Sequence, residues 1–329
     1  MKLFCKNKKI DCLIAGNGVV GSAVIKMINS QKNYFAKNNI DLNIIAIFNS
    51  KKIFINDKEI EYQSLDEVIN LFKKNSKNEH VFIDCTSSNF LVSNYKKFIE
   101  NRFNIITPNK KANTLDIEKF IQLEECFLKN KKYFFYEANV GAGLPIVSTI
   151  RDLIACGDEI IKIEGIFSGT LSYIFNNFND QKFSEIVLDA KEKGFTEPDP
   201  KEDLSGMDVG RKLLILARMI GYKINLSDIK IESLAEISDE NIAILNQKAN
   251  QDNKILRYIG VIEDGRVCAK IVSVSKDHPL ASTQYTDNII SITTKSYNKT
   301  PLIVKGPGAG VNVTAIGIIS DLIRLIGMI

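Results

Sequence analysis

Histidine is scarce in this chain of 329 residues, and its cysteines form no metal-binding pattern. Because only His80 and His278 are present, a site built from several histidine ligands is excluded. No Cys-x-x-Cys pair occurs, so no zinc site of the usual spacing is expected. Several cysteines lie within apolar runs, which favours buried free thiols in a reducing compartment. The six are Cys5, Cys12, Cys85, Cys126, Cys156 and Cys268.

Long uncharged apolar runs are also absent. None reaches the roughly 18 residues that cross a bilayer, and the C-terminal candidate is interrupted by Asp321 and Arg324. The opening residues, MKLFCKNKKIDCLIAG, lack the apolar core and cleavage site of a signal peptide. A net charge of +4, spread over the whole chain, is too small for a nucleic-acid-binding surface. We therefore expect a cytoplasmic protein with neither a nucleic-acid nor a membrane partner.

The overall composition is that of a globular protein. Apolar residues make up 45% of the chain and charged residues 25%, which excludes disordered and fibrous classes. The length of 329 residues predicts about two domains.

The first half of the chain alternates apolar strands with amphipathic helices. Such alternation, with strands that are apolar throughout, is typical of an α/β fold with a Rossmann-like doubly wound parallel sheet. The stretch Ser64-Leu65-Asp66-Glu67 predicts a capping box that opens a helix to about Lys74. The expected strands cover residues 10–15, 42–48, 81–85, 104–107 and 133–138.

The second half has a different pattern, typical of an α+β domain with antiparallel strands. Asp264-Gly265, between two apolar runs in 255–274, predicts a β-hairpin. Gly157, Gly194 and Gly221 follow helical stretches and are expected to end them. The expected helices cover 145–156, 171–178, 184–193, 207–220 and 308–329, and a strand is expected at 160–167.

Residues 16–21, GNGVVG, match the GxGxxG pattern in the required place, after a strand and before a helix. The first glycine permits a tight turn, the second lets the backbone approach a pyrophosphate, and the third lets helix and strand pack closely. The loop is therefore predicted to bind a dinucleotide, and the alternative is a glycine-rich turn without a ligand. Its residues are Gly16, Asn17, Gly18, Val19, Val20 and Gly21.

The end of the second predicted strand favours NADP over NAD. Dinucleotide-binding folds that take NAD carry an acidic residue there, which binds the ribose 2′-hydroxyl. Here the residues are Asn49, Ser50, Lys51 and Lys52, which suit a 2′-phosphate. NAD stays open as a cofactor, and a solvated turn is the alternative reading of the two lysines.

Further polar residues follow the next two strands, at the sheet edge where ligands bind in this fold. Thr86 and Ser87 follow residues 81–85, and Lys110 follows residues 104–107. We expect all three to face the nicotinamide end of the cofactor. In a chain this rich in lysine, an ordinary solvated surface position is the alternative for Lys110.

The densest polar cluster covers residues 196–212. Asp208 and Lys212 are four residues apart and share a helix face. A buried lysine beside a carboxylate can donate a proton or stabilise an alkoxide. An exposed acidic turn with a surface salt bridge is the alternative. The acids that can bind a substrate ammonium are Glu197, Asp199, Glu202 and Asp203.

Together these segments resemble the homoserine dehydrogenase family, especially the dehydrogenase portion of bifunctional aspartokinase–homoserine dehydrogenases. The resemblance spans nearly the whole chain in the family's order. It implies reversible, NAD(P)H-dependent reduction of L-aspartate 4-semialdehyde to L-homoserine, in threonine and methionine biosynthesis. The matching segments are GNGVVG (16–21), TPNKKAN (107–113), YEANVGAGLP (136–145), FSGTLSYIFN (167–176), GFTEPDPKEDLSGMDVGRKLLILAR (194–218) and GPGAGVNVT (306–314).

The resemblance also implies roles for individual residues. Lys212 matches the proposed proton donor, and Asp208 matches the acid that orients the reacting group or its water. Lys110 matches a lysine between nicotinamide and substrate, and Gly310 matches a glycine that contacts the cofactor.

Two sets of residues match binding sites of the family. The acids that bind homoserine correspond to Glu197 with Glu202 or Asp203. A monovalent-cation site, usually for sodium and built mainly from main-chain carbonyls, corresponds to Glu137, Val140, Ala142 and Leu144.

Domain boundaries and partners follow from the same resemblance. We expect residues 1–138 to form a dinucleotide-binding domain, joined by a C-terminal helix at 306–329, and residues 139–305 to form a catalytic and dimerisation domain. The family is typically dimeric, so a homodimer is expected. Nothing before residue 10 can be an aspartokinase domain, which makes a separate aspartokinase chain a candidate partner. Nothing after residue 329 can be a regulatory ACT-type domain, so feedback inhibition by threonine through such a domain is not expected.

Two other functions are alternatives. An aspartate-semialdehyde dehydrogenase needs a nucleophilic cysteine with a histidine base, which two scattered histidines make a poor match. A non-catalytic dinucleotide-binding sensor, or a degenerate subunit, is the alternative from a different functional class.

Overall fold

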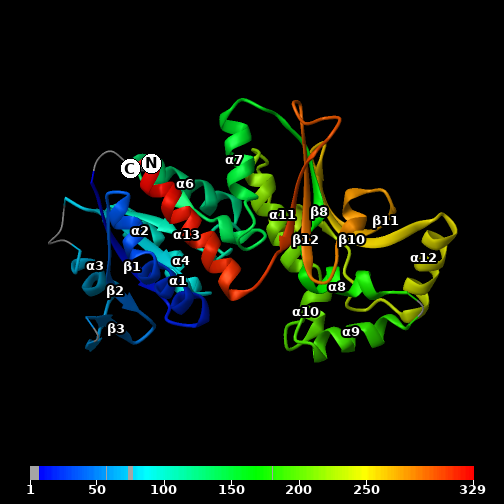
Figure 1. Ribbon diagram of the computed structural model, residues 1–329, viewed down its shortest axis with the longest axis horizontal. Helices are drawn as coiled ribbons and strands as arrows, with labels where there is room; N and C mark the ends of the chain where they lie inside the picture. The colour runs from blue at the N-terminus through cyan, green and yellow to red at the C-terminus, as the bar shows by residue number, and fades with distance from the viewer. Residues whose placement is uncertain (1–6, 57, 73–76, 180) are drawn as a thin grey trace. The chain divides into compact units, whose positions relative to one another are not determined.

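The computed structural model describes residues 7–56, 58–72, 77–179 and 181–329 of the chain. It divides into two compact units (Figure 1). The first consists of Met1–Gly143 with Gly310–Ile329, and the second of Leu144–Ala309. The sequence-based boundaries lay at residues 138/139 and 305/306, a few residues earlier in each case.

The first unit contains a seven-stranded sheet in the order β4-β3-β2-β1-β5-β6-β7. Its central strands run parallel, as predicted. Two features correct the prediction. An antiparallel hairpin extends the sheet beyond β2, so the sheet is mixed, and the strand expected at 133–138 is reduced to two residues. The strands are β1 (Lys8–Ala15), β2 (Ile40–Phe48), β3 (Lys52–Ile55), β4 (Lys58–Glu61), β5 (Glu79–Asp84), β6 (Phe103–Ile106) and β7 (Phe134–Phe135).

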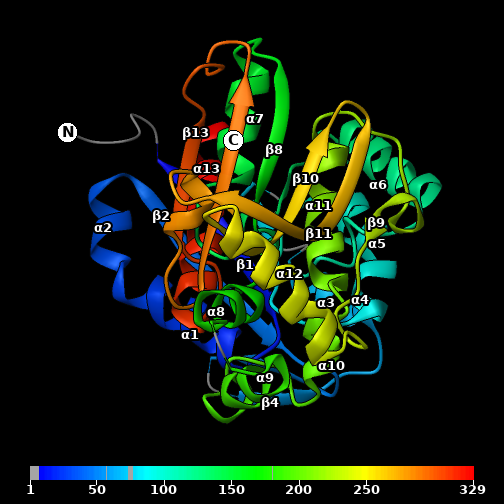
Figure 2. The same ribbon diagram turned by 90° about the vertical axis from the view of Figure 1, so that its right-hand side faces the viewer.

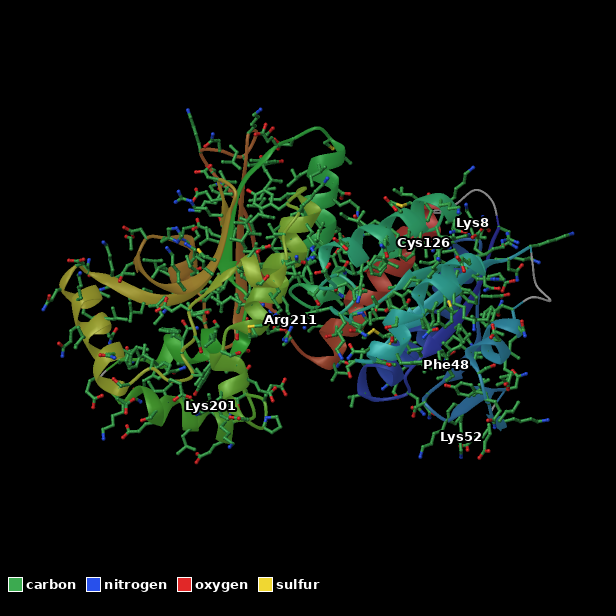
Figure 3. All side chains as sticks on the ribbon, turned by 180° about the vertical axis from the view of Figure 1, so that it is seen from behind. Lys8, Phe48, Lys52, Cys126, Lys201 and Arg211 are labelled. Atoms are coloured by element: carbon green, nitrogen blue, oxygen red, sulfur yellow. The ribbon has the colours of Figure 1, made fainter. Side chains whose placement is uncertain are left out.

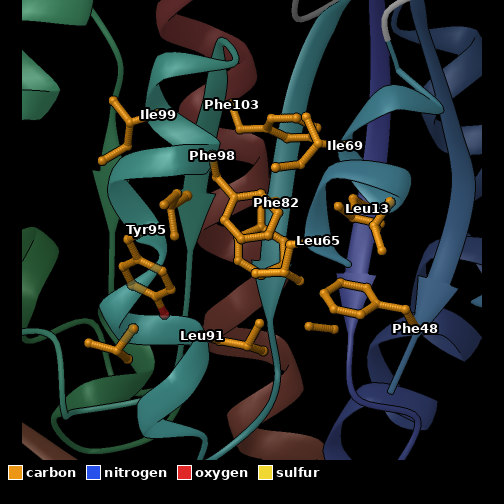
Figure 4. Packing of buried hydrophobic residues seen from close by; sticks show 14 of the residues in the cluster. Leu13, Phe48, Leu65, Ile69, Phe82, Leu91, Tyr95, Phe98, Ile99 and Phe103 are labelled. Carbon is orange, nitrogen blue, oxygen red and sulfur yellow. The ribbon is translucent and has the colours of Figure 1, made fainter. Parts of the chain in front are cut away.

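Helices cover both faces of this sheet, because its strands are apolar on both sides. In β1, Leu13 packs into one buried cluster, and Cys12 and Ile14 pack into the other. The first cluster includes the stacked rings of Phe82 and Phe98, whose centroids are 4.1 Å apart (Figure 4). Helices on that face are α3 (Leu65–Asn70), α4 (Asn89–Ser93), α5 (Tyr95–Glu100) and α6 (Ile117–Asn130); those on the other are α1 (Val19–Ser30), α2 (Lys32–Lys37) and α13 (Val311–Met328).

The capping box predicted at Ser64 does not form in its reciprocal shape. The Ser64 side chain accepts no hydrogen bond from the α3 backbone. Its hydroxyl instead donates to Glu67 Oε1 over 3.3 Å, and the Gln63 N–H donates to the same carboxylate. Helix α3 ends at Asn70, before the predicted end near Lys74, which lies outside the described residues.

Helix α13 carries two charged side chains in an apolar sequence, and the structure explains both. Asp321 is 1% exposed and accepts a hydrogen bond from the Glu137 N–H over 2.6 Å. Arg324 contacts the carboxylates of Glu137 (2.7 Å) and Asp321 (3.3 Å). By length and composition alone, α13 is the one helix of the described chain that could cross a membrane. Its apolar face, however, packs against β1 and α1 in the core of the first unit.

The second unit is built on a six-stranded sheet in the order β13-β12-β8-β10-β11-β9 (Figure 2). Its pairs are antiparallel except that of β11 with β9. The predicted hairpin is confirmed: Asp264 and Gly265, with φ of 49° and 73°, join β10 to β11. The strands are β8 (Ile160–Ile166), β9 (Lys230–Ile231), β10 (Lys254–Glu263), β11 (Arg266–Ser275), β12 (Asp287–Thr294) and β13 (Leu302–Pro307).

Three helices of the second unit, α7, α9 and α11, end where the sequence predicts, whereas α12 was not predicted. Gly157, Gly194 and Gly221 all have positive φ just after a helix. A short helix that the sequence did not predict begins in the acidic loop, where Asp199 caps it and Pro200 is its first residue. The helices are α7 (Val147–Ala155), α8 (Gly169–Asn177), α9 (Phe183–Glu192), α10 (Pro200–Leu204), α11 (Met207–Met219) and α12 (Asp239–Gln251).

Substitution of Arg324 tests the buried ion cluster of the first unit. Arg324→Met should lower the free energy of unfolding by about 3 kcal/mol, because it removes the guanidinium that two buried carboxylates contact. Chemical denaturation measures the change. Lys97→Met, which removes an exposed pair with Asp66, is the control and should cost at most about 1 kcal/mol. Equal losses in the two variants would contradict this account.

Candidate active site

The glycine loop of the first unit connects the end of β1 to α1, and its three glycines meet three different demands. Gly16 has a φ of 90°, a conformation that favours glycine. A Cβ on Gly21 would lie 2.0 Å from the Gly16 carbonyl oxygen, so only glycine fits where helix and loop pack. A Cβ on Gly18 would meet nothing within 4 Å. The first and last glycines thus shape the loop, and the middle one leaves open space at the start of α1, where a pyrophosphate binds in this fold.

A pocket of about 370 Å³ lies beside the glycine loop, at the carboxyl ends of β1, β2 and β5. This is the edge at which ligands bind in open α/β sheets. Its lining combines residues from the loop and from the two strand ends singled out in the sequence. They include Gly16, Asn49, Ser50, Tyr62, Thr86 and Ser87.

The segment after β5 is held by a buried carboxylate. Asp84 is fully buried and accepts hydrogen bonds from the Thr86 N–H (2.9 Å), the Thr86 hydroxyl (2.6 Å) and the Tyr95 hydroxyl (2.7 Å). Burial raises the pKa of the Asp84 carboxyl, although these hydrogen bonds oppose that shift. Thr86 is thereby fixed in the wall of the pocket.

The segment after β6 is tied to the segment after β5. The Thr107 hydroxyl donates to Asp84 O over 2.8 Å, and Lys111 Nζ donates to Ser87 O over 2.6 Å. Lys110, the lysine predicted to face the nicotinamide, is half-buried in this loop. The neighbouring lysine, Lys111, therefore has a structural contact that the sequence did not indicate.

The turn after β2 uses Asn49 in its own folding. Asn49 Oδ1 accepts hydrogen bonds from the N–H groups of Lys51 (2.9 Å) and Lys52 (3.0 Å). Lys52 pairs with Glu59 at 2.5 Å, whereas Lys51 is exposed. Of the polar side chains predicted at this strand end, Asn49 thus has its partners within the turn, and Lys52 has its partner on β4.

In the second unit, Lys212 lies on α11 as a buried ammonium. The residue is 8% exposed, and Nζ lies 2.8 Å from Asp208 Oδ2, one helical turn earlier. Nζ also donates to the main-chain oxygen of Phe167, at the end of β8, over 2.6 Å. The Lys212 side chain is 10% exposed and the Asp208 side chain 45%. Because the lysine is buried, the pair is not an ordinary surface salt bridge, which was the alternative.

Helix α11 is anchored by close contacts at its start. Gly206 has a φ of 69°, and a Cβ there would lie 2.2 Å from the Tyr258 hydroxyl. A Cβ on Gly210 would lie 2.3 Å from Ile231. Since both glycines are required for this packing, the helix is held against β9 and β10, and the position of Lys212 is fixed with it.

The acids of the predicted substrate site differ in their surroundings. Asp203 accepts hydrogen bonds from the Thr170 hydroxyl (2.8 Å) and from the Glu197 N–H (2.8 Å), so its carboxylate organises the acidic loop. Glu197 and Glu202 are exposed. The two candidates for the second substrate-binding acid therefore differ: the Asp203 carboxylate is hydrogen-bonded within the loop, whereas the Glu202 side chain is exposed.

Sequence reasoning missed three residues around these groups. They are Phe167, whose carbonyl receives Lys212; Asn288, which donates to the same carbonyl; and Thr170, which holds Asp203. Phe167 and Thr170 lie in FSGTLSYIFN, a segment that carries the family resemblance but for which no residue roles were predicted. No local pattern marks Asn288, because it lies 121 residues from Phe167.

The segment matched to a cation site turns sharply after the 3₁₀ turn at Glu137–Asn139. Gly141 and Ala142 have φ of 75° and 54°. The Glu137 side chain is 1% exposed and pairs with Arg324. The only oxygen donors that Glu137, Val140, Ala142 and Leu144 then have in common are their main-chain carbonyls. Gly310, the predicted cofactor contact, also has a positive φ (116°) and precedes α13.

The predicted site residues therefore divide between the units. The glycine loop, the strand-end residues, Lys110 and Gly310 belong to the first unit, and Asp208, Lys212 and the acidic loop belong to the second. Figure 3 marks Phe48 at the end of β2 and Lys52 at the start of β3 in the first unit, and Lys201 on α10 and Arg211 on α11 in the second. The Rossmann-like glycine loop and the pocket at the strand ends place the chain in the class of dinucleotide-binding proteins.

Comparison with known proteins specifies the family. Residues 16–137 match the model "Homoserine dehydrogenase, NAD binding domain", and residues 145–323 match the model "Homoserine dehydrogenase". The chain is 37% identical to homoserine dehydrogenase of Saccharomyces cerevisiae, over 97% of this chain and 98% of that protein. The chain belongs to the homoserine dehydrogenase family.

Other relatives differ in length. The chain is 40% identical to chloroplastic bifunctional aspartokinase/homoserine dehydrogenase 2 of Arabidopsis thaliana, covering 95% of this chain but 38% of that protein. A crystal structure of a Candida auris protein of unknown function shares the fold at a TM-score of 0.88 with 33% identity, covering 97% and 98% of the two chains. A hyperthermophilic archaeal homoserine dehydrogenase in complex with NADPH shares the fold at a TM-score of 0.77 with 22% identity, covering 96% and 97%.

Two alanine substitutions separate the roles of the loop glycines. Gly18→Ala should weaken dinucleotide binding about tenfold or more without lowering the melting temperature, because its Cβ enters the space open to the pyrophosphate and touches no protein atom within 4 Å. Gly21→Ala should lower the melting temperature, because its Cβ overlaps the Gly16 carbonyl. Calorimetry of binding and of unfolding measures both. Normal dinucleotide affinity in Gly18→Ala would contradict the assignment.

Proposed function

We propose that this chain catalyses the reversible reduction of L-aspartate 4-semialdehyde to L-homoserine with NADPH. The observation that carries the proposal is the buried Lys212 ammonium, held by Asp208 and the Phe167 carbonyl beside an acidic loop. When bound, the nicotinamide supplies hydride to the aldehyde carbon. Lys212 donates a proton to the oxygen of that aldehyde, so the carbonyl becomes an alcohol and the lysine is left neutral until it is reprotonated.

The acidic loop suits the amino end of this substrate. Glu197 and Glu202 are exposed carboxylates on a segment that Asp203 and Thr170 hold in shape. Carboxylates bind an ammonium group by charge-assisted hydrogen bonds, which fixes the substrate's orientation. Asp208, which contacts Lys212, can orient the reacting group or a water. Lys110 is a second candidate for the proton donor.

The turn after β2 supports NADP as the cofactor. Residues 49–52, which follow β2, include no acidic side chain to bind a ribose 2′-hydroxyl, and Ser50 lines the pocket. Lys51 is the exposed cation of this turn, since Lys52 is paired with Glu59. A 2′-phosphate beside Lys51 gains an ion pair that the 2′-hydroxyl of NAD does not.

The segment from Glu137 to Leu144 supports a monovalent-cation site, with sodium as the proposed ion. Its donors would be main-chain oxygens of Glu137, Val140, Ala142 and Leu144. Hard oxygen donors suit alkali cations, and the Glu137 carboxylate is already paired with Arg324.

Assembly and location are further parts of the proposal. A homodimer formed through the sheet of the second unit fits β13, an edge strand with Ile303 42% exposed. Because the bifunctional relatives are fused to aspartokinase, an aspartokinase chain is a proposed partner.

A role in threonine and methionine biosynthesis and a cytoplasmic location complete the proposal. The alternative of a non-catalytic sensor is not favoured, because the chain keeps the lysine–carboxylate pair.

Lys212→Ala tests the proton donor. It should lower kcat roughly 100- to 1000-fold while leaving NADPH affinity unchanged, because the variant loses a preorganised electrostatic donor. Steady-state assay of semialdehyde reduction measures the loss. Arg211→Ala changes the neighbouring exposed residue of α11 and should behave as wild type. Near-normal turnover in Lys212→Ala would refute the role.

Lys51→Ala tests the cofactor preference. It should raise KM for NADPH about fivefold and leave KM for NADH unchanged, since the lost interaction involves only the 2′-phosphate. Lys52→Ala is the matched control, expected to have a smaller effect because its ammonium is engaged by Glu59. Parallel increases for both cofactors would argue against recognition of the phosphate.

A further inference from the structure

One main-chain oxygen of the second unit has two side-chain donors. Lys212 Nζ donates to Phe167 O over 2.6 Å, and Asn288 Nδ2 donates to the same oxygen over 3.1 Å. A carbonyl oxygen has two lone pairs, so these two donors occupy it. Asn288 is on β12, which pairs with β8, the strand that ends just before Phe167. The buried ammonium of Lys212 is therefore linked through one oxygen to a side chain outside the conspicuous motifs.

The other half of the Asn288 amide is unsatisfied. The side chain is 0% exposed, and Oδ1 has no hydrogen-bond partner among the described residues. A buried acceptor without a partner is unfavourable, and an apolar side chain of similar shape would avoid the penalty. Stability alone therefore does not explain an asparagine at this position. The feature that distinguishes it from leucine is the donor directed at Phe167 O.

Gly308 provides the space for this amide. A Cβ on Gly308 would lie 2.0 Å from Asn288 Nδ2 and 2.1 Å from its Cγ. The atoms in conflict are the end of the Asn288 side chain, so an alanine at this position would displace the amide first. Gly308 belongs to the segment GPGAGVNVT, in which only Gly310 has a role implied by the family resemblance.

We propose that Asn288 is a positioning residue for proton transfer: its amide fixes the Phe167 carbonyl in the direction that receives Lys212, and Gly308 makes room for it. Phe167 lies between the end of β8 and Ser168, the N-cap of α8, so its peptide group is in a turn rather than in a strand ladder. With this oxygen fixed, two of the three Lys212 N–H groups point at Phe167 O and Asp208. The direction of the third N–H group, the one left for proton transfer, is then fixed as well. The inference rests on the proposed function only in taking Lys212 as the proton donor.

Asn288→Leu and Gly308→Ala test the role from two sides. Each should lower kcat for semialdehyde reduction about tenfold, in line with the loss of one hydrogen bond, with KM for NADPH changed by less than about twofold. The solvent deuterium isotope effect on kcat should increase, because proton delivery becomes slower than in the wild type. A residue that only supported the fold would not raise the isotope effect. If Asn288→Leu fails to fold, Gly308→Ala still carries the test.

Asn246→Ala is the matched control. Asn246 is also buried in the second unit and donates through Nδ2 to a main-chain oxygen, that of Asn179, over 3.0 Å. It should keep the wild-type isotope effect and kcat. An isotope effect raised as much in Asn246→Ala as in Asn288→Leu would overturn the proposal.

The double variant Asn288→Ala/Gly308→Ala separates a shared mechanism from two independent defects. Its kcat should equal that of Asn288→Ala alone, because the added Cβ would displace an amide that is no longer there. Multiplicative losses would overturn the proposed link between the two residues.

Chemical labelling distinguishes failure of this inference from failure of the proposed function. Acetic anhydride should label Lys212 several times faster in Asn288→Leu than in the wild type, because the Phe167 carbonyl that holds Nζ is no longer fixed by the Asn288 amide; peptide mass spectrometry gives the rate. Faster labelling of Asn288→Leu than of the wild type, together with no turnover by the wild-type protein, would overturn the proposed function and support the positioning role. Unchanged labelling with unchanged kcat would overturn the positioning role alone.

Discussion

A buried ammonium has to be surrounded by acceptors before any substrate arrives, and Lys212 imposes this requirement on the second unit. Asp208 supplies one acceptor from the same helix, and Phe167 O supplies the other from the end of β8. Both must stay in place, so the rigid parts of the unit converge on them. Gly206 and Gly210 let α11 pack against its neighbours, and β12 adds the amide of Asn288.

The constraint on the first unit is different: the glycine loop has to bring main-chain atoms close to the pyrophosphate of a dinucleotide without using a charged side chain. The glycine loop does this by geometry, since Gly16 turns the chain and Gly21 admits close packing. The loop is held in position by the Gly16 N–H, which donates to Phe48 O over 2.7 Å, and by Asp84, which fixes the adjacent segment. The pocket at the strand ends therefore has walls that do not depend on a ligand for their shape.

Local patterns predicted much of this arrangement. GNGVVG, the strands of the parallel sheet, the hairpin at Asp264-Gly265 and the helix-ending glycines depend on neighbours within a few residues, and the structure has each of them. The Asp208–Lys212 pair follows from helical spacing in the same way.

The features that sequence reasoning missed depend on tertiary contacts. Asn288 and Phe167 are distant in sequence, and the Arg324–Glu137 pair joins α13 to a turn 187 residues earlier. The capping box at Ser64 failed because Glu67 bonds to the serine side chain and to Gln63 instead of completing the reciprocal pattern. The antiparallel hairpin of β3 and β4 was missed because exposed, charged β4 has no apolar pattern to mark it.

In the proposed reaction, hydride goes to the aldehyde carbon of L-aspartate 4-semialdehyde while Lys212 protonates its oxygen. The most direct measurement supplies NADPH deuterated at the transferring position of the nicotinamide ring and examines the product by mass spectrometry and NMR. The account predicts L-homoserine with one deuterium on the carbon that bears the new hydroxyl. Folded protein that binds NADPH but forms no such deuterated product would contradict it.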